Sequence, residues 1–138
     1  MEELITMIEK SFVLIKPDAV ERNIIGKILD CYESNGLKIV SMKLFKVDKS
    51  LAEKHYEEHK GKVFYNSLIE YITRSPLCAV ILEGENAVEE VRKINGATDP
   101  EKASEGTIRN RFAVSKTENS VHSSDSKESA EREISLWF

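Results

Sequence analysis

The chain alternates between short apolar runs and apolar residues repeated at helical spacing. The apolar runs predict strands at residues 11–15, 37–45, 77–82 and 112–122. The helical repeats predict helices at residues 25–32, 50–56, 64–74, 87–94 and 130–137. The pattern therefore predicts strands that are separated by helices along the whole chain.

Polar and turn-forming residues mark where several of these elements begin and end. Asn-Gly pairs at 35–36 and 95–96 close two of the helices. Residues 50–53 fit a capping box that begins the second helix, and Ser-Asp-Ser at 124–126 offers an N-cap for the last one. The polar, glycine-containing stretch at 96–111 predicts a loop.

The order and length of these elements favour an α+β fold. Short, partly alternating strands between helices suit a ferredoxin-like βαββαβ sandwich, in which helices pack on one face of a four-stranded antiparallel sheet. A parallel, doubly wound sheet is an alternative that periodicity alone leaves open. No internal repeat and no Pro/Gly-rich linker divides the chain, so we expect one domain over residues 1–138.

Length and charge narrow the classes of protein to which the chain can belong. With 138 residues and a mass of 15.7 kDa, it can bury a core without disulfides or a structural metal. Its net charge of −4 argues against a nucleic-acid-binding surface, which needs excess positive charge. The longest apolar run, residues 77–82, is far shorter than the roughly 20 residues that span a bilayer. We therefore expect no nucleic-acid partner and no membrane partner.

The amino-terminal segment and the cysteines favour a cytoplasmic location. Residues 1–10 begin with acidic side chains, and they lack the apolar core of a secretory signal and the arginines of a transit peptide. Cys31 and Cys78 lie in apolar segments without metal-like spacing, so we expect two buried free thiols in a reducing compartment.

One histidine and three cations are the residues best suited to carry chemistry. His122 lies between a predicted strand and a predicted helix, where rigid elements hold a loop side chain, although a lone histidine is more often structural. Lys16, Arg92 and Arg109 are each most simply a solvated charge, but together they would bind phosphate groups. The chain has neither a P-loop nor the Gly-rich loop of protein kinases, so nucleotide chemistry would need another construction.

Six segments together resemble one known family. They are Ile-Lys-Pro-Asp-Ala-Val (15–20), His-Tyr (55–56), Gly-Ala-Thr-Asp-Pro (96–100), Gly-Thr-Ile-Arg (106–109), Asn-Ser-Val-His-Ser-Ser-Asp-Ser (119–126) and Ser-Ala-Glu-Arg-Glu-Ile (129–134). In order and spacing they are similar to the nucleoside diphosphate kinases over almost the whole chain. That family has the ferredoxin-like fold favoured above.

The resemblance implies a role for each of several side chains. His122 would be the catalytic nucleophile and would carry a phosphoryl group on Nδ1, while Glu133 binds the opposite ring nitrogen. Ser124 would support Glu133, and Phe64 would stack on the nucleotide base. The implied contacts to the sugar hydroxyl and the phosphates are Lys16 (also counted as catalytic), Tyr56, Asn119, Arg92, Thr98 and Arg109.

The implied activity is the reversible transfer of the terminal phosphate of ATP, or of another nucleoside triphosphate, to a nucleoside diphosphate. An imidazole suits a ping-pong route because its pKa of about 6.5 leaves it mostly neutral at pH 7. The resemblance also implies broad base and sugar tolerance. It implies Mg²⁺ that is held mainly by the nucleotide phosphates, with Asp125 contacting it through water.

A homotetramer or homohexamer is the assembly that the resemblance implies. The aromatic pair Trp137-Phe138 would then pack against a neighbouring subunit, or it would complete the chain's own core. Both alternatives remain open at this point.

Three positions depart from the usual pattern of the family, and none removes a catalytic group. Ser123 follows the histidine where glycine is commonest, Arg111 replaces an acidic residue, and Val63 replaces a frequent proline. Two other functions compete with the enzyme: a ferredoxin-like module that binds nucleotides or nucleic acid without turnover, and a regulatory or scaffolding member of the family. The retained histidine, carboxylate and cations favour the enzyme.

Overall fold

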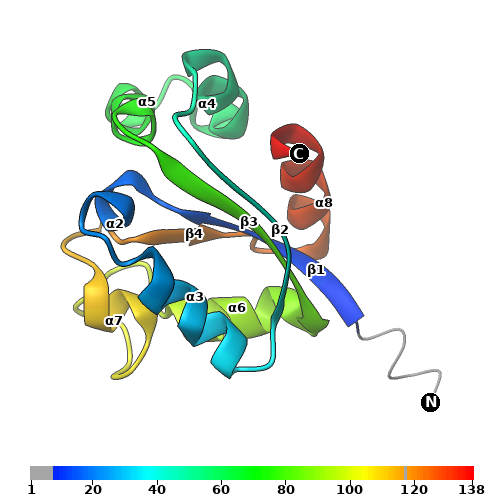
Figure 1. The fold of residues 1–138 in the computed structure, drawn as a ribbon. Coiled ribbons are helices and arrows are strands. Elements are labelled where there is room, and N and C mark those ends of the chain that lie inside the picture. The colour runs from blue at the N-terminus through cyan, green and yellow to red at the C-terminus, as the bar shows by residue number, and fades with distance from the viewer. Residues whose placement is uncertain (1–7, 117) are drawn as a thin grey trace.

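A four-stranded antiparallel sheet forms the centre of the molecule. The computed structural model describes residues 8–116 and 118–138, and the sheet has the strand order β2-β3-β1-β4 (Figure 1). The strands are β1 (Ile8–Ile15), β2 (Lys38–Phe45), β3 (Leu77–Glu85) and β4 (Val121–Ser123). The ferredoxin-like α+β prediction is confirmed, and the parallel, doubly wound alternative is wrong.

Helices connect the strands. They are α2 (Pro17–Glu21), α3 (Ile25–Ser34), α4 (Lys49–His55), the short 3₁₀ helix η1 (Glu57–His59), α5 (Tyr65–Thr73), α6 (Ala87–Asn95), α7 (Ile108–Phe112) and α8 (Lys127–Trp137). The long helices α3, α5 and α6 begin and end close to the predicted residues, because their apolar positions repeat over more than two turns.

The helices cover both faces of the sheet, rather than one face as the sequence suggests. Successive residues of β1 alternate between two cores: Val13 and Ile15 pack in one, and Phe12 and Leu14 in the other. In Figure 1, α3, α6 and α7 lie below the sheet, whereas α4 and α5 lie above it. A strand that is covered on both sides needs apolar side chains on both sides, which explains the nearly continuous apolar runs in β1 and β3.

The shortest elements differ most from the prediction. α2 follows β1 directly, with Pro17 at its start, and α7 begins inside the stretch predicted as a loop. Each of these helices has five residues, which is too few to display a helical repeat. The strand predicted at residues 112–122 reduces to the three residues of β4, and Thr117 within that range lies outside the described residues.

The capping prediction is wrong for α4 and right for α8. Asp48 is the N-cap of α4, where its Oδ1 accepts a hydrogen bond from the Leu51 amide at 2.8 Å. Ser50 lies in the first turn instead, so residues 50–53 do not form a capping box. Ser126 is the N-cap of α8, and its Oγ accepts from the Ser129 amide at 3.0 Å.

The two terminal aromatic residues, Trp137 and Phe138, lie in different environments. Trp137 is only 2% exposed and belongs to the core that contains Phe12, whereas Phe138 is 39% exposed. Cys31 and Cys78 are free thiols, as expected, but only Cys78 is buried, and the expectation that Cys31 is buried is wrong because it is partly exposed on α3.

Across residues 8–116 and 118–138, no helix combines the length and the apolar character needed to cross a membrane. The expectation about targeting signals concerns residues 1–10, of which residues 1–7 lie outside the described part of the chain.

Candidate active site

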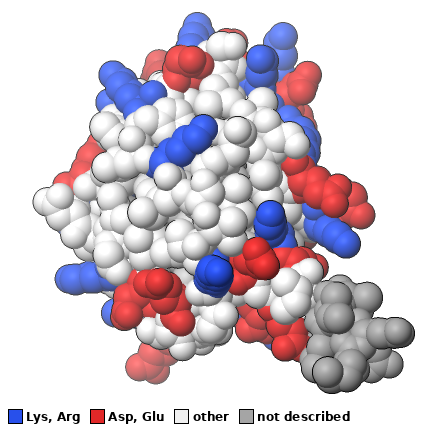
Figure 2. Space-filling view, turned by 45° about the vertical axis from the view of Figure 1, so that its right-hand side comes forward, with Lys and Arg blue, Asp and Glu red and all other residues white. Residues whose placement is uncertain are grey.

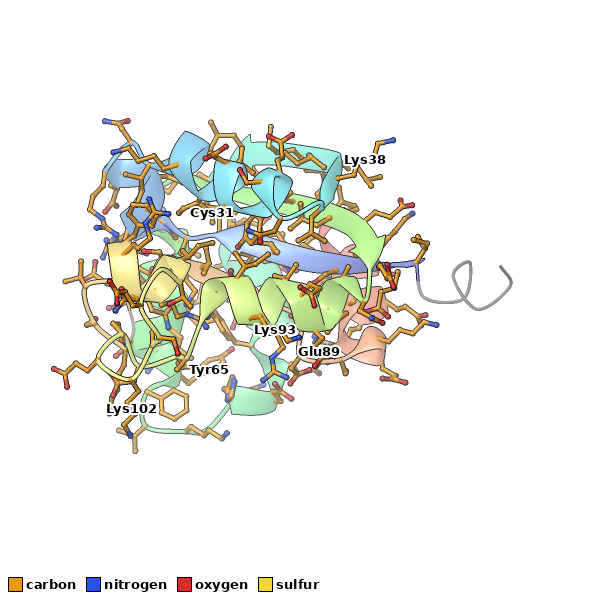
Figure 3. The ribbon with its side chains drawn as sticks, turned by 90° about the horizontal axis from the view of Figure 1, so that it is seen from below. Cys31, Lys38, Tyr65, Glu89, Lys93 and Lys102 are labelled. Atoms are coloured by element: carbon orange, nitrogen blue, oxygen red, sulfur yellow. The ribbon has the colours of Figure 1, made fainter. Side chains whose placement is uncertain are left out.

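A cleft of about 1580 Å³ brings together segments that lie far apart in the sequence. Residues of η1, α6, β4 and α8 line it, together with the loop between α6 and α7. Seen from below, α6 carries Glu89 and Lys93 and the following loop carries Lys102, and all three line the cleft (Figure 3). The predicted site residues in its wall are Lys16, Tyr56, Arg92, Thr98, Arg109, Asn119, His122, Asp125 and Glu133.

His122 is held by a buried carboxylate. Its Nε2 lies 2.7 Å from Oε2 of Glu133, which is 6% exposed, and the other carboxylate oxygen accepts a hydrogen bond from Ser124 Oγ at 2.5 Å. An ionised carboxylate only accepts, so the proton of this bond belongs to Nε2 of the imidazole. Nδ1 of a neutral His122 then carries the lone pair, and the chain offers it no hydrogen bond within the described residues.

The backbone before His122 is anchored from three sides. His122 pairs with Leu14 of β1, and the amide of Lys16 donates to the carbonyl of Ser120 at 2.9 Å. Ser120 is fully buried and has a φ of +74°, a left-handed conformation that is costly for a residue with a side chain. Its Oγ accepts from Arg22 at 3.1 Å and donates to Asp18 at 3.5 Å, and these contacts hold the strained residue in place.

Lys16 and Asn119 form a buried pair at the end of β1. The Lys16 ammonium donates to Asn119 Oδ1 at 3.0 Å, and the Asn119 amide donates to the carbonyls of Lys116 and Thr98 at 2.9 and 3.3 Å. Burial, with the nearby Arg109 as a second cause, lowers the pKa of Lys16 to about 8, while Asp18 opposes that shift. Lys16 is therefore a cation at neutral pH that has lost much of its hydration.

Arg109 lines the cleft and also holds together two backbone segments that form it. Its two terminal nitrogens each donate at 2.8 Å to a backbone carbonyl, one of Gly96 and one of Val121. Burial lowers the pKa of Arg109, and Nε is buried without a partner among the described residues. Gly96 has a φ of +85°, and a Cβ there would approach Thr107 Oγ1 to 2.5 Å, so only glycine fits this junction.

Aromatic side chains lie at one end of the site. Tyr56 is buried in the cleft wall, and burial, with the Glu133 carboxylate as a second cause, raises its pKa to about 12. Its hydroxyl therefore keeps its proton at neutral pH. Phe64 does not line the cleft; it is 47% exposed, and its ring centroid lies 5.6 Å from that of His59, which does line it. Phe64 thus stands at the entrance of the cleft.

Two features of the site escape sequence reasoning. His55 lines the cleft, 6% exposed, with its ring centroid 4.8 Å from that of His122. Its only sequence signal is the His-Tyr pair within the family pattern. Three further cations line the cleft, namely Lys93, Lys102 and Arg132, and their positions in the sequence give no sign that they converge there.

The cluster of His55, His122 and Glu133 also has the spacing of a metal site. One ligand atom from each lies within 4.8 Å of the others. Nε2 of His122 is already hydrogen-bonded to Glu133, however, and Nδ1 of His55 accepts from the indole of Trp137 at 3.2 Å. A cation bound at these two nitrogens would have to break both bonds, so this donor set suits an oriented imidazole better than a metal centre.

Comparison with known proteins finds one family throughout. A family model described as nucleoside diphosphate kinase matches residues 9–138. The nucleoside diphosphate kinase of Clostridium perfringens (strain SM101 / Type A) is 69% identical over 131 residues, which cover 95% of this chain and 92% of that protein. The solved enzyme of Aquifex aeolicus has a TM-score of 0.91 and 38% identity, with 95% of both chains covered. A Halobacterium salinarum enzyme in complex with CDP has the same TM-score of 0.91 and 42% identity, over 94% of this chain and 87% of that one.

Proposed function

The chain belongs to the nucleoside diphosphate kinase family and is therefore an enzyme, and we propose that it transfers the terminal phosphate of ATP or another nucleoside triphosphate to a nucleoside diphosphate through a phosphohistidine on His122. The observation that carries this proposal is the 2.7 Å bond between Nε2 of His122 and Glu133. That bond supports a proton on Nε2 and a free lone pair on Nδ1, in a cleft of about 1580 Å³ whose wall includes six Lys and Arg side chains as well as six carboxylates.

The reaction proceeds in two displacements at one site. Nδ1 of His122 attacks the terminal phosphorus of the triphosphate, an N–P bond forms, and the bond from that phosphorus to the bridging oxygen breaks, so the diphosphate leaves. A second diphosphate then enters, and an oxygen of its terminal phosphate attacks the phosphohistidine. The N–P bond breaks, and its electron pair returns to Nδ1. Both nucleotides use the same cleft in turn, so the kinetics are ping-pong.

Glu133 and the cations stabilise the charges that develop. The Nε2 proton stays on the imidazole as the ring becomes positive, and the ionised Glu133 balances that charge. Lys16, Arg92 and Arg109 line the cleft, which supports contacts to the phosphate oxygens from more than one side. The hydroxyl of Thr98 would contact the phosphate chain, and Oδ1 of Asn119, which keeps one lone pair beside its bond from Lys16, would accept from the sugar hydroxyl.

Mg²⁺ fits the oxygen chemistry of one edge of the cleft. Asp125 lines it with an exposed carboxylate, whose pKa is lowered chiefly by the hydrogen bond from Ser129 Oγ at 2.6 Å. A single ionised carboxylate beside bound phosphates suits a cation that takes oxygen ligands and retains several waters. Asp125 would hold the ion through water, and the ion would neutralise part of the phosphate charge.

Phe64 supports broad tolerance for the base. Its half-exposed ring at the cleft entrance offers a stacking surface, and every base has a π-face. We therefore expect purine and pyrimidine diphosphates all to be substrates.

A homotetramer or homohexamer in the cytoplasm is the assembly and location that we propose. The edge strand β2 supports self-association, because Val40, Met42 and Leu44 are 41%, 51% and 61% exposed along it. Figure 2 likewise shows a broad area with few charged side chains, bordered by acidic and basic residues. Within the view drawn there, no broad basic surface for nucleic acid is present.

Labelled ATP tests the proposed route directly. Incubation of the protein with ATP that carries a label on its terminal phosphate should leave an acid-labile, base-stable phosphate on His122, and unlabelled GDP should discharge it as labelled GTP. A label found only on serine, or transfer that requires both nucleotides to be bound together, would show that the covalent route is wrong.

A further inference from the structure

Trp137 and His55 form a hydrogen-bonded pair directly behind the proposed nucleophile. The indole Nε1 of Trp137 donates to Nδ1 of His55 at 3.2 Å. Nδ1 of His55 in turn lies 3.9 Å from Oε2 of Glu133, the same oxygen that accepts from His122. The rings of His55 and His122 meet edge to face, at 81°.

The indole determines where the proton of His55 lies. An indole nitrogen only donates hydrogen bonds, so the atom that faces it must present a lone pair. Nδ1 of His55 is therefore unprotonated, and the ring proton is on Nε2. Without the indole, the opposite tautomer would be available, and its Nδ1–H would lie beside Glu133.

His55 is also held neutral, so it does not form an ion pair with Glu133. Burial is the main cause that lowers the pKa of His55 to about 2, and the neighbouring His122, Arg132 and Lys16 contribute to the same shift. The contact of 3.9 Å to Glu133 is therefore a contact between a carboxylate and the lone-pair side of a neutral ring.

We propose that Trp137 is a positioning residue, which keeps Nδ1 of His55 unprotonated and thereby reserves Glu133 for His122. Glu133 already accepts from Ser124 on Oε1 and from His122 on Oε2. A second donor at Oε2 would share that oxygen with His122, draw part of its negative charge away and so weaken the bond that fixes the tautomer of His122. This inference rests on the proposed function, because it concerns how Glu133 orients the nucleophile.

Trp137→Phe separates the hydrogen bond from the packing. The variant keeps an aromatic ring against Phe12 and removes only the N–H donor and part of the ring volume. His55 is then free to protonate Nδ1 and to donate to Glu133. We expect the rate of phosphohistidine formation from ATP to fall by roughly tenfold, as for other partners that act through a catalytic group, with the nucleotide KM unchanged.

A double variant distinguishes competition from simple loss of packing. Trp137→Phe combined with His55→Leu removes the competing donor, so most of the lost rate should return. A packing defect would instead make the double variant slower than the single one. Phe45→Leu is the matched control, since Phe45 packs against Trp137 with centroids 6.0 Å apart but donates nothing to His55. Rapid-quench measurement of phosphohistidine formation in the wild-type protein and the three variants should show a strong decrease in rate only for Trp137→Phe.

The ¹⁵N resonances of the His55 ring test the tautomer without any variant. In the wild-type protein Nδ1 should have the shift of an unprotonated nitrogen, and in Trp137→Phe the proton should appear on Nδ1. A wild-type Nδ1 that carries the proton would overturn the inference, as would a Trp137→Phe protein that is phosphorylated at the wild-type rate. Failure of the proposed function is a separate result, because the wild-type protein itself would then form no phosphohistidine.

Discussion

At the scale of single residues, the site depends on which nitrogen or oxygen each group has available. Glu133 uses both carboxylate oxygens, one for Ser124 and one for His122, and this arrangement leaves the lone pair of the His122 ring on Nδ1, the atom that we propose as the nucleophile. Two substitutions test the role of the proposed nucleophile and the role of its orienting partner separately.

His122→Ala should lower kcat by at least roughly 10⁴-fold, because the covalent route loses its attacking atom. Glu133→Gln should cost less, about 10- to 100-fold, since it weakens the orientation of the ring and leaves Nδ1 in place. Steady-state kinetics measure both changes. Nucleotide binding, measured by calorimetry, should survive in His122→Ala because Lys16, Arg92 and Arg109 remain. Full activity of His122→Ala would contradict the assignment.

Lys16 should make nucleotide use depend on pH above neutrality. Burial lowers its pKa to about 8, so its positive charge is present below that pH and is lost as the pH rises through it. The ratio kcat/KM, which reports the free enzyme, should therefore fall above pH 8. Lys16→Arg is the control, since a guanidinium keeps its charge to far higher pH. Whatever its absolute activity, Lys16→Arg should show no decrease in kcat/KM above pH 8. The same decrease in that variant would mean that a group other than Lys16 causes it.

At the scale of helices and strands, sequence patterns succeed where an element is long and fail where it is short. The apolar repeat locates α3, α5 and α6, but α7, with five residues, remains hidden in a polar stretch. The same limit applies to the site. Arg109 can be singled out as a cation, but its bonds to the carbonyls of Gly96 and Val121 depend on tertiary contacts that no local pattern records.

Asp48 and Ser50 offer a direct test of which residue caps α4. Asp48→Ala should lower the free energy of unfolding by about 1 kcal/mol, because the Leu51 amide loses its acceptor. Ser50→Ala should change it little, since its side chain does not cap the helix. Urea denaturation of the two variants measures the difference. An equal or larger decrease in the free energy of unfolding for Ser50→Ala would mean that residues 50–53 do form a capping box.

At the scale of the whole molecule, helices cover both faces of the sheet at its centre, but β2 lies at an edge and keeps the apolar side chains of Val40, Met42 and Leu44 exposed. The alternation of Phe12 and Leu14 with Val13 and Ile15 between two cores was visible in the sequence only as a continuous apolar run. Such a run indicates burial on both sides, whereas the preference for helices on one face came from the general ferredoxin-like plan.

Self-association through β2 can be tested by light scattering. The wild-type protein should have four or six times the 15.7 kDa mass of the chain at micromolar concentration. Met42→Lys combined with Leu44→Lys should reduce that mass, because two charges would be buried at the edge of the sheet. Val63→Lys places one lysine at a fully exposed position outside β2 and should leave the mass unchanged. A wild-type mass of 15.7 kDa would end the oligomer proposal.

The pairing of β1 with β4 has a consequence for how activity arises during synthesis. Lys16 emerges from the ribosome early, but its partner Asn119 follows 103 residues later, and the nucleophile and its carboxylate come later still. The last strand to be synthesised is therefore the strand that carries the proposed nucleophile. A nascent or truncated chain has the cations but no nucleophile, so it cannot consume nucleoside triphosphates. Enzymatic activity would consequently report completion of the fold, and its return during refolding should coincide with closure of this long-range contact.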